Sequence, residues 1–237
     1  MQLSKRLNKV ASFVTKGNRL ADVGTDHGYI PIYLVENGTV PTALAMDINK
    51  GPLERAKEHI SEYGLEDKIE TRLSDGLQYL GKGEADTVLI AGMGGALTVK
   101  ILENGREVLS TVKELILSPH SEINLVRKYI ISEGYKIVKE DMVFDAGKYY
   151  TVIKAEKTDK GPEKYSEAEE MYGKFLCYRH NVEFKDFIDK EHNMLSDLYN
   201  NLKNNSSESA VRRLKEVGRA LELNRIIREG NDCRCQK

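Results

Sequence analysis

The sequence lacks several features that would assign it to common classes of protein. It has three cysteines in 237 residues, and none belongs to a paired framework, which favours a reducing cytoplasm over a disulfide-stabilised secreted protein. The N-terminus has no apolar signal-peptide core, and no apolar run approaches membrane-spanning length. The net charge is −1, so no excess of one sign predicts a partner. We therefore expect a soluble cytoplasmic protein that does not enter a membrane, with any nucleic-acid contact confined to a local basic surface.

Cysteine and histidine, the usual ligands of zinc, are also sparse. Cys177 lies close in sequence to His180, and Cys233 and Cys235 form a C-x-C pair near the C-terminus. These spacings lack the second pair of ligands that a structural zinc site requires. We therefore predict that the protein binds no metal.

The most informative segment that is present is RLADVGTDHGYIP, residues 19–31. An apolar run ends in Asp22, a loop with Gly24 and Gly28 follows, and a second apolar run begins. This order is typical of a strand that turns into a helix around a ligand, because glycine has no Cβ to hinder close approach. The spacing is not G-x-G-x-x-G, which excludes the dinucleotide fingerprint. Asp22 and Asp26 would repel a pyrophosphate but suit a ligand with an ammonium and a sulfonium, and this predicts S-adenosylmethionine (SAM).

Strand and helix patterns alternate over the first 155 residues. The alternation predicts an α/β fold with a mostly parallel sheet and helices on both faces. The last two strands flank a short, turn-rich linker and are expected to form an antiparallel hairpin. By fold analogy, this is the Rossmann-like sheet of class I SAM-dependent methyltransferases, with the last strand antiparallel. The predicted strands are 19–24, 42–47, 69–73, 87–91, 114–117, 135–143 and 149–155, and the predicted helices are 3–14, 29–37, 51–63, 95–102 and 122–132.

The composition changes after residues 158–162, TDKGP. Strand signals vanish, and apolar residues recur at spacings of three and four, interrupted at residues 204–207. This pattern predicts two or three long helices packed as an antiparallel coiled coil. We therefore divide the chain into a SAM-dependent methyltransferase domain, residues 1–160, and a C-terminal helical domain, residues 161–237.

Residues at the ends of successive strands extend the predicted cofactor site. Asp47, followed by Ile48, ends the second strand about 20 residues beyond the glycine loop, where a carboxylate binds ribose hydroxyls. Asp75 and Gly76 close the third strand, where a carboxylate can accept from the adenine amine. Residues 91–93 close the fourth, where the transferred methyl group is expected. The full set predicted to bind SAM is Asp22, Gly24, Thr25, Asp26, His27, Gly28, Asp47, Ile48, Asp75, Gly76, Ala91, Gly92 and Met93.

These residues also have a purely structural explanation. Asp22 and Asp26 suit turn and helix-cap positions, and an Asp-Gly pair such as residues 75–76 is a common turn. Their recurrence at successive strand ends favours the ligand role. An N-P-P-Y motif, which supports transfer to an exocyclic amine, is absent. Its absence favours an acceptor with an available lone pair, such as a ring nitrogen.

Taken together, the motifs resemble those of a known family. The segments GTDHGYIP (24–31), DINKGP (47–52), SDGL (74–77), AGMGG (91–95) and GKYY (147–150) look like those of the bacterial TrmK family, the tRNA (adenine(22)-N1)-methyltransferases. The resemblance runs from residue 4 to about residue 154. One departure is LSPH at 117–120, where the family pattern is Leu-Gln-Pro-Asn or similar. The resemblance implies an enzyme that transfers the methyl group of SAM to N1 of an adenine in the D-arm of tRNA.

For such a reaction the catalytic candidates are Asp26, His27 and Tyr29. N1 of neutral adenine has a free lone pair, so placement of the base matters more than a general base. The base must leave its stack to react, and the product is cationic. Asp26 would stabilise the developing charge, and His27 and Tyr29 would stack against the base. Alternatively, these are solvent-facing residues of the first turn of a helix.

Basic residues indicate where tRNA phosphates could bind. Lys5, Arg6, Lys9 and Arg19, together with Lys16, cluster around the first helix; the alternative is a solvated helix face. The basic residues of the C-terminal helices either grip the tRNA body or face a second copy, so a monomer and a weak dimer both stay open. They are Lys174, Arg179, Lys185, Arg212, Arg213, Lys215, Arg219, Arg225 and Arg228.

Two other functions remain compatible with the sequence. One is SAM-dependent methyl transfer to another RNA, a small molecule or a protein. The other is a nucleotide- or RNA-binding module without catalysis. Binding of SAM, followed by transfer of its methyl group to tRNA, would separate the three.

Overall fold

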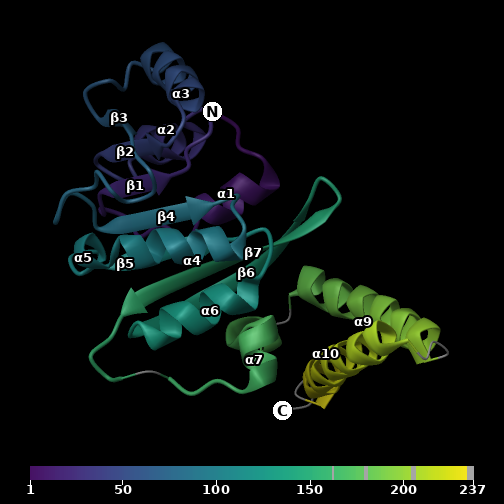
Figure 1. Ribbon diagram of the computed structural model, residues 1–237. Helices are drawn as coiled ribbons and strands as arrows, with labels where there is room; N and C mark the ends of the chain where they lie inside the picture. Colours follow the sequence, from purple (N-terminus) through teal and green to yellow (C-terminus); the bar gives the residue numbers. More distant parts are fainter. Residues whose placement is uncertain (162, 179–180, 204–206, 234–237) are drawn as a thin grey trace. The chain divides into compact units, whose positions relative to one another are not determined.

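The computed structural model describes residues 1–161, 163–178, 181–203 and 207–233 (Figure 1). The chain divides into two units, Met1–Glu163 and Lys164–Lys237, and each is described by itself. Among the described residues, no helix has both the length and the apolar character needed to cross a membrane.

The first unit is built on strands β1 (Leu20–Val23), β2 (Ala43–Asp47), β3 (Ile69–Leu73), β4 (Thr87–Ala91), β5 (Glu114–Ser118), β6 (Tyr135–Asp145) and β7 (Lys148–Lys157). They form one sheet in the order β3-β2-β1-β4-β5-β7-β6. The first five strands are parallel, and β7 runs antiparallel to both β5 and β6. This confirms the predicted Rossmann-like, mostly parallel sheet with an antiparallel hairpin.

Helices cover both faces of this sheet. They are α1 (Lys5–Ala11), α2 (Tyr29–Glu36), α3 (Lys50–Glu62), α4 (Gly95–Asn104), α5 (Arg106–Leu109) and α6 (Ile123–Ser132). Residues of α1, α2 and α3 share one apolar core with β1, β2, β4 and β5, and α4 and α6 lie against the opposite face (Figure 1).

The first helix is shorter than predicted. It begins after Ser4, whose Oγ accepts the Leu7 N–H (3.2 Å), and it ends at Ala11. Phe13 and Val14 lie beyond that end and are still buried. Their apolar character therefore reflects burial in the core rather than a continued helix. The four-residue helix α5 was not predicted, because it is too short to show a period.

A buried carboxylate fixes the segment after α1 to the sheet. Glu114 accepts hydrogen bonds from the backbone N–H and the hydroxyl of Thr15 and from the Thr87 hydroxyl. Lys154 Nζ lies 2.7 Å from the same carboxylate. Burial acts to raise the pKa of Glu114, but these donors hold that pKa below its ordinary value. The ionised carboxylate, on β5, therefore links the segment after α1 with β4 and β7.

The second unit contains α7 (Glu167–Tyr172), α8 (Lys174–Tyr178), α9 (Val182–Lys203) and α10 (Glu208–Cys233). The two long helices are antiparallel, because Tyr199 lies near Gly218 whereas Asp189 pairs with Arg228. Between them, Asn224 is fully buried and donates to the Ile188 carbonyl (3.2 Å). A buried amide of this kind fixes the register of two packed helices. Most of the predicted interruption at 204–207 lies outside the described residues.

The residues considered for zinc lie largely outside the described part of the chain. His180 and Cys235 are not described, and neither are the side chains of Cys177 and Cys233. Within the described residues, no group of three His, Cys, Asp or Glu is placed to hold a metal ion.

Candidate functional site

The carboxyl ends of β1 to β4 meet at one edge of the sheet, and the strand order reverses between β1 and β4. In open α/β sheets, ligands bind at this point. Backbone hydrogen bonds join the loops there. The N–H groups of Gly24 and Thr25 donate to the Met46 carbonyl (2.8 and 2.9 Å), and the Ser74 N–H donates to the Asp47 carbonyl (2.8 Å). The structure thus brings the predicted cofactor residues of four loops to one edge.

The loop after β1 requires glycine at two positions. Gly24 has φ +77°, and Gly28, which precedes α2, has φ +69°. A Cβ on Gly24 would lie 2.1 Å from Cε of Met93, so the loops after β1 and β4 touch there. His27 also has a positive φ, +58°, which is uncommon for a residue with a Cβ. Strained backbone of this kind clusters at functional sites.

Asp22 lies at the bottom of this loop and is 6% exposed. Burial raises the pKa of its carboxyl to about 7, and the nearby Asp47 carboxylate adds to the rise. The buried Thr25 hydroxyl acts against this rise in pKa. His27 Nδ1 is buried and has no hydrogen-bond partner among the described residues. A ligand that brings an ammonium to Asp22 and a polar group to His27 would satisfy both, so the residues present fit SAM.

The loops after β2 and β3 present carboxylates near the same edge. Asp47 Oδ1 accepts the Asn49 N–H (2.7 Å), and Ile48 is 58% exposed. In the next loop, Gly76 has φ +57°, and its carbonyl accepts the Ser74 hydroxyl (3.0 Å). These contacts keep the 47–49 and 74–76 turns in fixed conformations.

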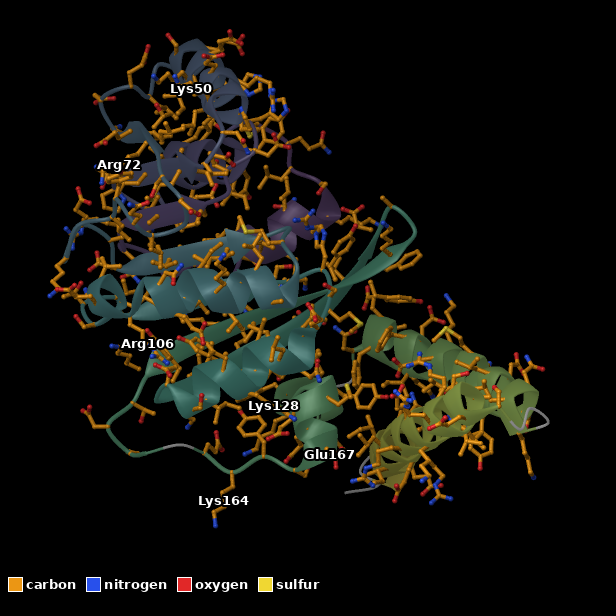
Figure 2. The ribbon with its side chains drawn as sticks, viewed as in Figure 1. Lys50, Arg72, Arg106, Lys128, Lys164 and Glu167 are labelled. Atoms are coloured by element: carbon orange, nitrogen blue, oxygen red, sulfur yellow. The ribbon has the colours of Figure 1, made fainter. Side chains whose placement is uncertain are left out.

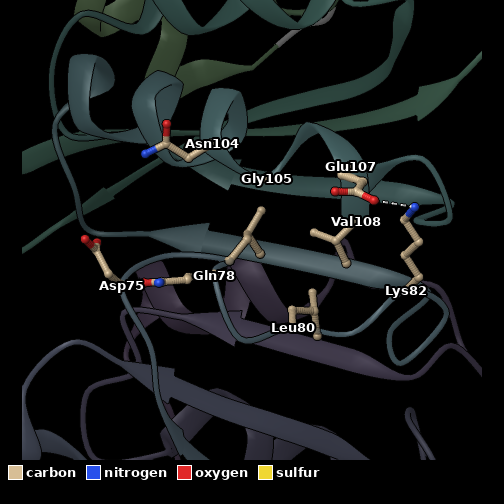
Figure 3. Close-up of a pocket in the computed structure, with 9 residues that line it drawn as sticks. Asp75, Gln78, Leu80, Lys82, Asn104, Gly105, Glu107 and Val108 are labelled. Atoms are coloured by element: carbon tan, nitrogen blue, oxygen red, sulfur yellow. Dashed lines mark ion pairs between the residues drawn. The ribbon is translucent and has the colours of Figure 1, made fainter.

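A pocket of about 780 Å³ opens beside Asp75 (Figure 3). Asp75 and Gln78 lie on one side of it, and Asn104 lies across from them on α4. At its far end Lys82 pairs with Glu107 (2.7 Å). Of the predicted SAM residues, Asp75 alone lines this pocket. The pocket therefore adjoins the predicted adenine end of the site rather than containing the site.

Asp26, His27 and Tyr29 form a group that faces α3. The Asp26 carboxylate is 73% exposed and lies 3.3 Å from His27 Nε2 and 3.6 Å from Arg55. The rings of His27, Tyr29 and His59 are nearly parallel, with centroids 5.2 to 5.5 Å apart. His59 Nδ1 also donates to the His27 carbonyl (2.9 Å). Sequence reasoning missed Arg55 and His59, although their spacing of four residues on one helix could have indicated a shared face.

A second group lies against the loop after β4. A Cβ on Gly92 would lie 2.9 Å from Nη2 of Arg6 and 3.9 Å from Cε1 of His120. The Arg6 guanidinium lies 5.0 Å from the centre of the Tyr150 ring, and the His120 and Tyr150 rings lie 5.3 Å apart. The sequence predicted Arg6 as a phosphate ligand but missed His120 and Tyr150. The unusual LSPH segment (117–120) and the GKYY motif (147–150) are the sequence features that could have indicated these two residues.

The other residues predicted to bind tRNA are placed differently. Lys9 pairs with Asp141 (2.7 Å) and Arg19 with Asp86 (2.9 Å), whereas Lys5 is exposed. Figure 2 shows further charged side chains of the first unit, such as Arg106 on α5. In the second unit, basic side chains pair within the unit: Arg213 with Glu216, Arg219 with Glu167 and Glu222, Arg225 with Glu229, and Arg228 with Asp189. Arg179 lies outside the described residues.

Comparison with known proteins gives consistent matches. A family described as "Methyltransferase domain" matches residues 3–153. The tRNA (adenine(22)-N(1))-methyltransferase of Bacillus subtilis is 35% identical over 94% of this chain and 95% of its own length. The crystal structure of the B. subtilis m1A22 tRNA methyltransferase TrmK has a TM-score of 0.87 and 34% identity, covering 96% of this chain and 99% of that one. The Streptococcus pneumoniae protein Sp1610 in complex with SAM has a TM-score of 0.85 and 33% identity, covering 96% of this chain and all of that one (100%).

Proposed function

Because this chain belongs to the tRNA (adenine(22)-N1)-methyltransferase family, we propose that it transfers the methyl group of SAM to N1 of adenine 22 in the D-arm of tRNA. The family resemblance recognised in the sequence motifs is thereby confirmed. The single observation that carries the proposal is the similarity of nearly the whole chain, both units included, to a relative of that activity. We also propose that the protein acts in the cytoplasm, because its proposed substrate is tRNA.

SAM supplies a methyl group on a positively charged sulfur. As N1 forms its new bond to carbon, the carbon–sulfur bond breaks, S-adenosylhomocysteine leaves, and the positive charge passes to the adenine. N1 carries no proton in neutral adenine, so the protein need not remove one. Its tasks are to bind both partners, to align N1 with the methyl group and to exclude water.

We propose that three carboxylates bind SAM: Asp22 at its ammonium, Asp47 at its ribose hydroxyls and Asp75 at its adenine amine. Their supports are the burial of Asp22 and the position of the other two at the ends of β2 and β3. Gly24, Thr25, Gly28, Ile48, Gly76, Ala91, Gly92 and Met93 would supply the surrounding backbone and side-chain contacts.

Asp26, His27 and Tyr29 are proposed to act beside the reacting groups. The exposed carboxylate of Asp26 would stabilise the positive charge that passes to the base. The stacked rings of His27, in the loop, and Tyr29, the first residue of α2, offer flat surfaces near Asp26. Residues 1–160 would carry the chemistry, and residues 161–237 would bind the body of the tRNA.

Labelled methyl transfer tests this function directly. Purified protein with methyl-labelled SAM should label an unmodified tRNA transcript that has adenine at position 22, and reverse transcription should stop there, because N1 lies on the pairing edge. A transcript with guanine at that position is the matched control and should stay unlabelled. SAM should also raise the unfolding temperature of the protein. Binding of SAM without labelling of either transcript would favour a small-molecule or protein substrate, or a module without catalysis.

A further inference from the structure

The loop after β4 contacts two groups of side chains through neighbouring residues. Met93 Cε lies next to Gly24 of the predicted SAM loop. Gly92 lies next to Arg6 and His120. A ligand at Gly24 and a ligand at Arg6 would therefore both reach the 92–93 segment. Methyl transfer requires its two reactants next to each other, with the acceptor nitrogen in line with the methyl group.

The backbone holds the second group in place. The Gly92 N–H donates to the Ser118 carbonyl (3.1 Å), and the His120 N–H donates to the Met93 carbonyl (2.8 Å). The Arg6 N–H donates to Asp145 (2.9 Å) at the end of β6. These bonds join the loop after β4 to the 118–120 segment, and α1 to the end of β6. In Figure 1, the β6–β7 hairpin extends past the sheet beside α1.

The Arg6 side chain differs from other arginines of the first unit. Arg19 and Arg127, for example, each pair with a carboxylate through Nε (2.9 and 2.7 Å). Nε of Arg6 is buried and has no hydrogen-bond partner among the described residues. The Asp145 carboxylate accepts the Arg6 backbone N–H instead. A buried hydrogen-bond donor without a partner destabilises the folded protein unless a ligand accepts a hydrogen bond from it.

His120 and Tyr150 add two rings with polar edges. The rings are tilted by 59°, and Arg6 covers the Tyr150 ring. Partial burial and the positive charges of Arg6 and Lys148 lower the pKa of His120. The imidazole is therefore neutral near pH 7, and one ring nitrogen can accept an N–H.

The geometry points to Arg6, His120 and Tyr150 as the binding site for the target adenine nucleotide. This inference rests on the proposed function and deepens it. The His120 and Tyr150 rings contact the flipped base, His120 accepts a hydrogen bond from its N6 amine, and Arg6 donates to its phosphate. The group of Asp26, His27 and Tyr29 lies toward α3, and its proposed role beside the reacting groups is separate from holding the base.

Paired substitutions of the full-length protein test this site. Tyr150→Ala should lower kcat/KM for tRNA by about tenfold to a hundredfold, the loss expected for removal of a base-stacking ring, whereas Tyr150→Phe should stay within about threefold because it keeps the ring. His120→Ala should lose activity in the same range, and His120→Asn should recover most of it because an amide oxygen also accepts. Arg6→Gln should mainly raise KM. The affinity for SAM, measured by calorimetry, should change by less than about twofold in all five, as expected for sites that act independently.

Two further measurements keep the result interpretable. Tyr63→Ala and Arg106→Gln remove an exposed ring at the end of α3 and a surface charge on α5, elements that carry none of the three site residues, and both should match the wild type. A tRNA with 2-aminopurine at position 22 should brighten on binding the wild type, as its base leaves the stack, and less on binding Tyr150→Ala.

The possible outcomes separate the site from the function. If the wild type binds SAM but does not methylate tRNA, the proposed function fails, whatever the variants do. If the wild type methylates adenine 22 and Tyr150→Ala, His120→Ala and Arg6→Gln are as active, this site is wrong. Equal losses of SAM affinity and of activity would also overturn it, because the cluster would then serve the cofactor or the fold.

Discussion

At the scale of single residues, burial decides what the carboxylates of this site can do. Asp22 in β1 and Asp26 in the loop that follows are four positions apart, yet the first is 6% exposed and the second has a side chain that is 73% exposed. Burial raises the pKa of Asp22 to about 7. Its proton is therefore retained in the folded protein at a pH where the unfolded chain has lost it. The contribution of Asp22 to stability falls as the pH rises from about 4 to about 7.

A bound ammonium would favour the ionised form of Asp22 over the protonated form, because the opposite charges attract. We expect SAM affinity to rise by up to about tenfold per pH unit between about pH 5.5 and 6.5, where the ligand's amino group stays protonated. Calorimetry across that range should show the slope, with proton release on binding. Asp22→Asn should bind SAM more weakly at about pH 7 and show no slope. An unchanged slope in Asp22→Asn would mean that another group titrates.

At the scale of elements, the glycines after β4 serve different purposes. Gly92 has φ +88° and leaves room for the Arg6 side chain. Gly95, the first residue of α4, packs against the backbone of the 121–122 turn. A Cβ there would lie 2.5 Å from the Glu122 carbonyl oxygen and 2.7 Å from that of Ser121. The start of α4 is therefore in direct contact with the turn after β5, which holds His120 beside Gly92.

Gly95→Ala should destabilise the first unit, because backbone rather than a flexible side chain occupies the space. We expect a loss of about 1 to 3 kcal/mol in the free energy of unfolding, measured by denaturant titration with the slope checked for constancy. Gly51→Ala is the matched control. It lies in the first turn of α3 with its nearest neighbouring atom 3.7 Å away, and should be neutral or slightly stabilising. Equal free energies of unfolding for the two variants would show that the 121–122 turn shifts to make room for the added methyl group.

At the scale of the whole molecule, the chain combines a sheet unit and a helical unit, Met1–Glu163 and Lys164–Lys237. Each has buried apolar residues of its own, such as Leu89 in the first and Phe184 in the second. The predicted SAM residues all belong to the first unit. Many basic side chains of the second unit pair with carboxylates of the same unit, which reduces the charge available to tRNA phosphates.

Truncation after Glu163 tests the role of the second unit. The shortened chain should bind SAM with unchanged affinity and bind tRNA at least about tenfold more weakly, with a smaller salt dependence because phosphate contacts are lost. Light scattering of both chains provides the necessary control for association. Unchanged tRNA affinity together with loss of a dimer would show that the helices join two copies instead.

The sequence by itself determined the fold and the chemistry of the cofactor. Alternating strand and helix periods, with Asp22, Asp47 and Asp75 at strand ends, depend on local pattern and residue type, and both are visible in a single chain. Element boundaries were within a few residues, except where core residues such as Val14 continued the apolar spacing beyond a helix end.

Only the tertiary structure decided which side chains meet. Lys9 pairs with Asp141, 132 positions away, so a lysine predicted to bind phosphate is engaged by a carboxylate. Arg6, His120 and Tyr150 come from three distant segments, and they meet because β7 is inserted between β5 and β6 and the hairpin lies beside α1. Such contacts leave no local period in the sequence, since strand order and loop packing, rather than neighbouring residues, create them.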